Sequence, residues 1–92
     1  MVGIQLNKFL EVGKVTENEA IKWITELFEE SIDNIKPETR RDEIQSWDSL
    51  GVLNLIAGLD QQFDVLLAED EVTGLKKVGD ILEILKKYGK LS

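Results

Sequence analysis

Apolar residues recur at intervals of three and four positions in separate stretches of this chain, and no other feature limits its fold as strongly. In one stretch the recurring residues are Ile21, Ile24, Leu27, Phe28 and Ile32. Near the C-terminus they are Val78, Ile81, Leu82, Leu85 and Tyr88. Side chains at these intervals share one face of a helix, and an apolar face must be covered by another element. The pattern therefore predicts an all-α fold, and a length of 92 residues suits one domain.

The start of the first of these helices is marked by residues 16–19, Thr-Glu-Asn-Glu. This is a capping box, in which the Thr and the last Glu each satisfy an unpaired amide at a helix start. The apolar stripe that follows predicts a helix of about four turns that includes Ile32. Pro37 lacks an amide donor and disfavours helical backbone before it, so the helix should stop near residues 33–37.

Residues 38–47 are polar and show no sustained period, so we predict a long loop there. Its few apolar residues, together with Ile35 just before it, should anchor the loop to the core; these are Ile44 and Trp47. Long loops in so small a domain are often functional.

A second helix is predicted to begin at Asp48 and to end near Asp64. One apolar face is formed by Leu50, Leu53, Ile56 and Ala57, and it is widened by Val52, Leu55, Leu59 and Phe63. A helix that is apolar over so much of its circumference should be buried on more than one side, with Ile56 and Leu59 in the core. Gly58 indicates either close packing or a lightly filled space beside it.

Two further elements complete the prediction. Residues 68–72 can form one short acidic turn or helix, and the final amphipathic helix should stop at Gly89. The leading segment is left open between a short docked helix around residues 6–10 and a frayed end, since Gly3 and Gly13 interrupt it. We expect an N-terminal extension at 1–15, a folded domain at 16–89 and a tail at 90–92.

Two absent residue types exclude several functions. Without cysteine the chain has no disulfide, no thiolate nucleophile and no thiolate metal ligand. Without histidine it lacks the side chain that most often acts as a base near neutral pH and the commonest metal ligand. We therefore expect no catalytic residues and no metal site.

The charge and hydropathy of the chain narrow its partners. A net charge of −7, with lysine and arginine scattered in short pairs, disfavours nucleic acid and favours partners with a basic surface. No stretch is long and apolar enough to span a bilayer, and residues 1–8 do not resemble a signal peptide. A cytoplasmic, monomeric protein is expected.

Ser49 is the main candidate for chemistry. It lies in the sequence Trp-Asp-Ser-Leu-Gly at 47–51, at the predicted start of the second helix. A helix start offers unpaired amides and the positive end of the helix dipole, so a phosphate ester there is favoured. The purely structural alternative is that Asp48 or Ser49 is only an N-cap, a position both residue types prefer.

The whole order of elements bears on that choice. A helix, a long loop, Asp-Ser-Leu, a broadly apolar helix, an acidic turn and an amphipathic helix follow one another. In this order the chain resembles the acyl carrier protein family over roughly residues 16–88. The resemblance implies a small four-helix bundle in which Ser49 receives 4'-phosphopantetheine from coenzyme A. Asp48 and Leu50 correspond to the residues that flank the modified serine in the family.

The form of the motif is similar to stand-alone, specialised carriers. Peptidyl carrier domains usually show a Gly-Gly pair shortly before the serine, and residues 44–46 lack it. The resemblance implies acyl intermediates held as thioesters on the arm, in fatty-acid, lipid or polyketide-type biosynthesis, with an aminoacyl or peptidyl carrier as the alternative.

The partners implied are a phosphopantetheinyl transferase and enzymes that load and transfer acyl groups through basic docking surfaces. Carriers of the family dock through acids on the second helix, whereas this chain has Asn54, Gln61 and Gln62 there. The residues that remain for docking are Asp60, Glu69, Asp70 and Glu71, and a solvated charged face is their alternative role.

Three other functions are alternatives to this one. An unmodified helical interaction module would have the same stripes and acidity, and it would tolerate replacement of Ser49. A calcium-binding helix pair would need a loop of the form Asp-x-Asx-x-Asx-Gly, which is missing. An autonomous enzyme would need a base that the chain does not supply.

Overall fold

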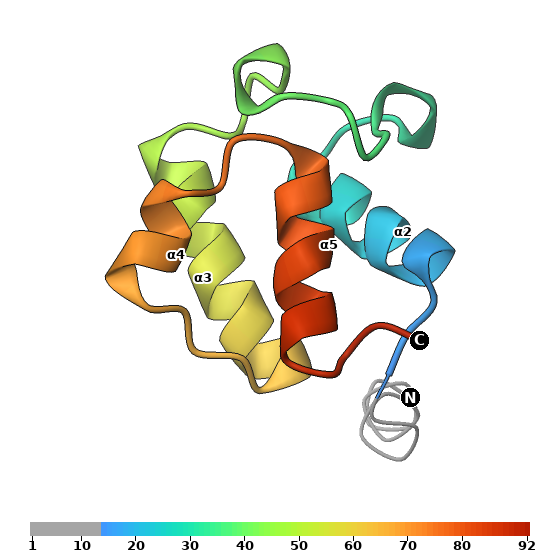
Figure 1. Cartoon of the computed structure of the whole chain (residues 1–92). Helices are drawn as coiled ribbons and strands as arrows, with labels where there is room; N and C mark the ends of the chain where they lie inside the picture. Colours follow the sequence, from blue (N-terminus) through green and yellow to red (C-terminus); the bar gives the residue numbers. More distant parts are fainter. Residues whose placement is uncertain (1–13) are drawn as a thin grey trace.

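The computed structural model describes residues 14–92 (Figure 1). These residues form four α-helices and no strand. The α-helices are α2 (Glu17–Leu27), α3 (Ser49–Phe63), α4 (Glu69–Thr73) and α5 (Val78–Lys87). Two 3-10 turns, η1 (Ile32–Asn34) and η2 (Arg41–Glu43), lie between α2 and α3. The predicted all-α bundle with a long loop between its first two helices is confirmed, whereas the segment around residues 6–10 lies outside the described residues.

Helix α2 begins as predicted and ends early. The Thr16 amide donates to Glu19 Oε1 (2.9 Å) and the Glu19 amide donates to Thr16 Oγ1 (3.1 Å), so the capping box is formed. The prediction of a fourth turn is wrong, because Glu29 adopts the left-handed conformation (φ 54°) and the helix ends before it. Its amide donates to Glu26 and the next amide donates to Thr25, a pairing that closes a helix end. Ile32 therefore lies outside the helix and is 54% exposed.

Helix α3 is capped at both ends by aspartate. Asp48 Oδ1 accepts a hydrogen bond from the Gly51 amide (2.9 Å), and Asp64 terminates the helix in the left-handed conformation (φ 57°). The prediction that α3 is buried on more than one side is wrong. Leu50 and Leu53 are 66% and 62% exposed, because the buried residues of α3, which recur from Gly51 to Phe63 at intervals of four, lie on the opposite face of the helix.

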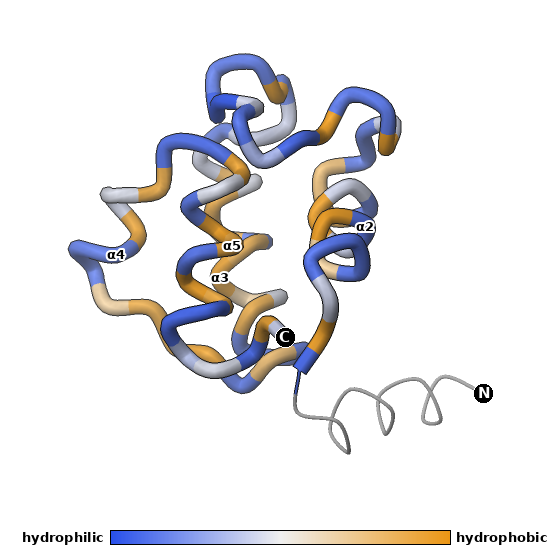
Figure 2. Tube along the Cα trace, turned by 45° about the vertical axis from the view of Figure 1, so that its right-hand side comes forward, coloured by the Kyte–Doolittle hydropathy of each residue, from blue (hydrophilic) through white to orange (hydrophobic). Residues whose placement is uncertain are grey.

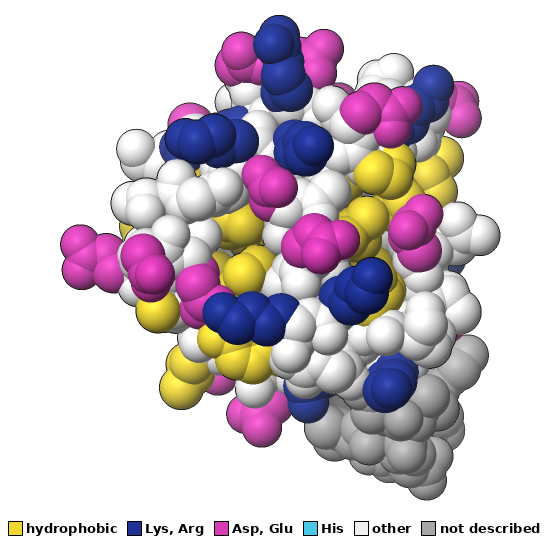
Figure 3. Space-filling view, viewed as in Figure 1, with side chains coloured by type: hydrophobic (Ala, Val, Ile, Leu, Met, Phe, Trp, Pro, Cys, Tyr) yellow, Lys and Arg dark blue, Asp and Glu magenta, His cyan; other side chains and the backbone are white. Residues whose placement is uncertain are grey.

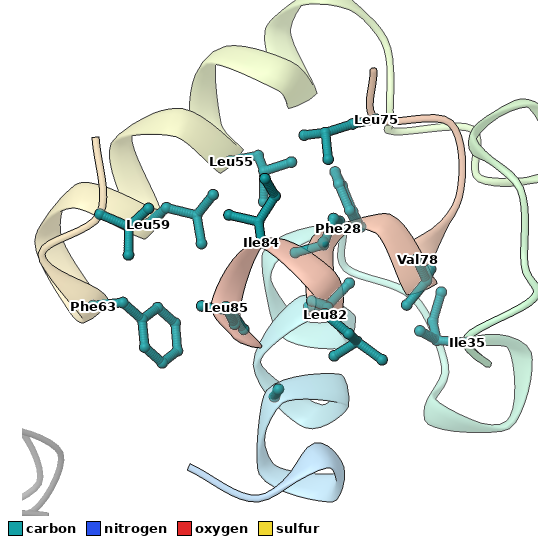
Figure 4. Close-up of a cluster of buried hydrophobic side chains, with 14 of the residues drawn as sticks. Phe28, Ile35, Leu55, Leu59, Phe63, Leu75, Val78, Leu82, Ile84 and Leu85 are labelled. Carbon is teal, nitrogen blue, oxygen red and sulfur yellow. The ribbon is translucent and has the colours of Figure 1, made fainter. Parts of the chain in front are cut away.

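The core is formed between α2, α3 and α5 (Figure 4). The buried residues of α3 are Gly51, Leu55, Leu59 and Phe63, and Ile56 is only partly buried. Along the chain, orange apolar segments alternate with blue polar ones in each helix (Figure 2). A Cβ at Gly58 would lie 2.8 Å from Trp23 Cζ2, so close packing explains this glycine.

The loop between α2 and α3 is held to the bundle by side chains and backbone. Its predicted anchors, Ile35, Ile44 and Trp47, are each 3% exposed, which confirms them. Backbone hydrogen bonds join the loop to the start of α5, including Arg41 N–H to Lys76 O (2.8 Å). The loop consequently passes over the ends of the helices as an ordered segment (Figure 1).

The described ends of the chain meet. Val15 is buried and its amide donates to Lys90 O (2.8 Å), while the Ser92 amide donates to Val15 O (2.9 Å). Within residues 14–92, no helix has the length and apolar character needed to cross a membrane.

Candidate functional site at the start of α3

Ser49 is the first residue of α3 and its side chain is exposed. Its hydroxyl makes no hydrogen bond to any residue in the described part of the chain. The N-cap role belongs to Asp48, whose carboxylate accepts from the Gly51 amide. The capping alternative therefore does not account for Ser49, and its oxygen is accessible to an approaching enzyme at the positive end of the α3 dipole.

The segment that precedes Ser49 is fixed at several points. Ser46 Oγ donates to the carbonyl of Phe28 at the end of α2 (2.5 Å), and the Phe28 and Trp47 rings stack with centroids 5.1 Å apart. Arg41 Nε donates to the Trp47 carbonyl (3.1 Å). These contacts connect α2, the loop and the start of α3, so the backbone just before Ser49 is fixed by three separate interactions.

Gly51 permits this arrangement. A Cβ at Gly51 would lie 2.0 Å from the Ser46 carbonyl oxygen and 3.1 Å from its carbon. Any larger residue would therefore collide with the loop backbone just before Ser49. The sequence showed this glycine next to Asp-Ser-Leu, but no local pattern revealed that the loop crosses it so closely. Arg41 and Ser46 were likewise missed, because their partners lie six and eighteen residues away in a stretch without helical periodicity.

The acidic residues expected to dock partners lie in different surroundings. Asp60 is exposed on α3, and Glu69 and Asp70 are exposed in the first turn of α4. Leu50, on the first turn of α3, adds a largely exposed apolar side chain to the surface around Ser49.

Glu71 differs from its neighbours because its carboxylate joins α4 to α5. It accepts from Lys87 Nζ (2.7 Å), the Ala68 amide (2.8 Å) and Tyr88 Oη (2.9 Å), and its side chain is 10% exposed. The Lys87 hydrogen bond, followed by those of Ala68 and Tyr88, lowers the pKa of Glu71 to about 2. The same carboxylate raises the pKa of Lys87 and of Tyr88.

Comparison with known proteins places the chain in a family. No family model matches the sequence. A curated acyl carrier protein homolog of Mycoplasmopsis pulmonis (strain UAB CTIP) is 34% identical over 73 residues, which span 77% of this chain and 99% of the relative. An acyl carrier protein of Rickettsia bellii (strain RML369-C) is 28% identical over 72 residues, 78% of this chain and 84% of the relative. With this fold and with identity over nearly the whole length of a relative, the chain belongs to the acyl carrier protein family.

Proposed function

We propose that this protein is an acyl carrier whose Ser49 hydroxyl is the attachment point for 4'-phosphopantetheine. The main support is the position of that hydroxyl, exposed and unpartnered among the described residues, on a backbone held by Ser46, Trp47 and Asp48. The residues present fit the group, because a phosphodiester on Ser49 would lie beside the first-turn amides of α3, where negative charge is stabilised.

In this function the chain presents the Ser49 hydroxyl to the transferase, and the transferase supplies the catalytic groups. Ser49 Oγ forms the phosphodiester after losing its proton to a base of the transferase, and the nucleotide part of coenzyme A leaves. When bound, the arm supplies a thiol that holds acyl groups as thioesters. The anchored backbone keeps the attachment point in one place, so partner enzymes meet the cargo at high effective concentration. The carrier itself is a substrate and partner of enzymes.

The surface around Ser49 supports docking of these partners. Leu50 and Leu53 are exposed on α3, and Asp60, Glu69 and Asp70 supply negative charge on α3 and α4. We propose that a partner enzyme with a basic surface docks on these residues and makes an apolar contact with Leu50. We also propose that the carrier acts as a cytoplasmic monomer in fatty-acid, lipid or polyketide-type biosynthesis. Glu71, the fourth expected docking residue, has its carboxylate engaged by Lys87 and Tyr88 and contributes chiefly by holding α4 in place.

An unmodified interaction module is the second candidate, because the exposed leucines would suit a helical binding partner equally well. The two functions differ in what they require of Ser49. A module would bind its partner with alanine at this position, whereas a carrier would lose its arm.

The test is the intact mass of the protein after incubation with coenzyme A, magnesium and a broad-specificity phosphopantetheinyl transferase. Wild type should gain one phosphopantetheinyl group and Ser49→Ala should gain none while folding normally. Ser31→Ala is the matched control, since Ser31 is exposed and its side chain makes no capping bond. No gain with several transferases on folded wild type would refute the carrier function.

A further inference from the structure

A hollow of about 570 Å³ lies between the loop before α3 and the connector before α5. Its lining residues are Arg40, Arg41, Asp42, Ile44, Gln45, Trp47, Thr73, Leu75 and Lys76. Trp47 is two residues before Ser49, so their Cα atoms are at most about 7 Å apart. One residue that lines the hollow is thus close to the attachment point along the chain, and the volume of the hollow is in the range of small-molecule sites.

The rim of this hollow is positively charged, although the chain as a whole carries −7. Arg40, Arg41 and Lys76 line it with a single acid, Asp42. Arg40 Nε lies 3.4 Å from Asp42 and 3.9 Å from Glu43, so the charge of this cation is offset by two acids. Arg41 and Lys76 form no ion pair with any of residues 14–92, and Arg41 is oriented by its bond to the Trp47 carbonyl. Figure 3 shows lysine and arginine side chains near the top of the molecule, where this loop lies, with acidic side chains among them.

The floor of the hollow is apolar. Ile44, Trp47 and Leu75 line it, and each is at most 5% exposed. The Trp47 indole Nε1 is buried and has no acceptor among the described residues. A site with cationic groups at its rim and an apolar floor is suited to a short carbon chain that ends in an anion.

We propose that this hollow accepts the terminal carboxylate of a short acyl group carried on the Ser49 arm. This inference rests on the carrier function proposed above and specifies the class of cargo. A planar guanidinium and an ammonium can share a carboxylate, and the apolar floor can cover its carbon chain. A bare phosphate would leave most of the volume and the apolar floor uncovered, so the cargo's carboxylate fits the hollow better than the phosphate of the arm.

The test compares arms that differ only in the end of the cargo. The transferase loads wild type with the arm of coenzyme A, butyryl-coenzyme A or succinyl-coenzyme A, and intact mass verifies each product. The side-chain N–H resonance of Trp47, assigned by its loss in Trp47→Phe, then reports on the hollow in nitrogen–proton correlation spectra. Only the succinyl form should shift this resonance strongly, and salt should weaken the effect because the rim is exposed to solvent.

Variants of the rim make the result specific. Lys76→Gln should lower the ratio of bound to free carboxylate about two- to five-fold, as expected for one exposed charge pair, and should reduce the shift accordingly. Lys22→Gln is the matched control, because Lys22 is exposed on α2 and does not line the hollow. Equal spectra for the butyryl and succinyl forms, or the same shift with the unacylated arm, would overturn the inference. Failure to load wild type at all would instead refute the carrier function.

Discussion

The strongest structural demand at the site concerns Gly51, and replacing it with alanine should both destabilise the protein and disturb Ser49. The new Cβ would lie 2.0 Å from the Ser46 carbonyl oxygen, a backbone atom that cannot rotate away. Relief requires the loop to move, yet Ser46 is bonded to Phe28 and the next residue to Arg41. Overpacking costs roughly 1–3 kcal/mol and each hydrogen bond lost about 1 kcal/mol, against a gain of about 1 kcal/mol in helix propensity. With both hydrogen bonds lost, we expect a net loss of about 2–4 kcal/mol in the free energy of unfolding.

Urea unfolding followed by circular dichroism measures this loss, and the initial rate of phosphopantetheinyl transfer measures the disturbance of Ser49. Gly74→Ala is the control, because Gly74 has ordinary helical dihedrals (φ −80°) and a Cβ there would approach its nearest backbone oxygen at 3.3 Å. It should change the stability by less than about 0.5 kcal/mol. A Gly51→Ala protein with wild-type stability and an unchanged transfer rate would show that the loop does not constrain the start of α3.

Further predictions concern the core and the contact between α4 and α5. Leu59→Ala should lower the free energy of unfolding by about 2–5 kcal/mol, measured in urea, because Leu59 is fully buried. Ile56→Ala should lower it less, because Ile56 is only partly buried. Leu53→Ala should leave the stability within about 0.5 kcal/mol of wild type but weaken acyl transfer to partner enzymes. A loss of stability as large as that of Leu59→Ala would place Leu53 in the core. Glu71→Gln should be less stable than wild type at pH 7. Because the folded pKa of Glu71 is depressed, its contribution is present above the ordinary value of 4.5 and is lost as the pH falls through about 2, so the difference between the two proteins should shrink across that window in urea melts. In a Tyr88→Phe background, Glu71→Gln should cost less stability, because one hydrogen bond to the carboxylate is already absent. A stability difference between wild type and Glu71→Gln that does not change with pH would contradict the depressed pKa of Glu71.

Much of the fold follows from local patterns in the sequence. The capping box at Thr16 and the stripes of α2 and α5 required only neighbours within one helical turn, and the structure has them. The location of Ser49 at a helix start followed from the change in pattern after Asp48. The buried anchors of the loop were also predictable, since isolated apolar residues in a polar stretch tend to find the core.

Where local patterns failed, the deciding contacts were distant or conformational. Apolar spacing continued to Ile32, but Glu29 took a left-handed conformation that is uncommon for a residue other than glycine. The apolar residues of α3 gave no indication of which side the other helices would cover, so the helix was expected to be buried on more than one side although Leu50 and Leu53 are exposed. Periodicity identifies a face, and only packing decides which face is covered.

What the amino-acid sequence determined about this protein is the type and order of its helices, the lack of histidine and cysteine, and a serine at the start of α3. The tertiary structure decided how that serine is presented. It placed the Ser46 carbonyl against Gly51, engaged Glu71 with Lys87 and Tyr88, and gathered cations from two segments around one hollow. Helix formation depends on residues a few positions apart, whereas these contacts join segments that only the folded chain brings together.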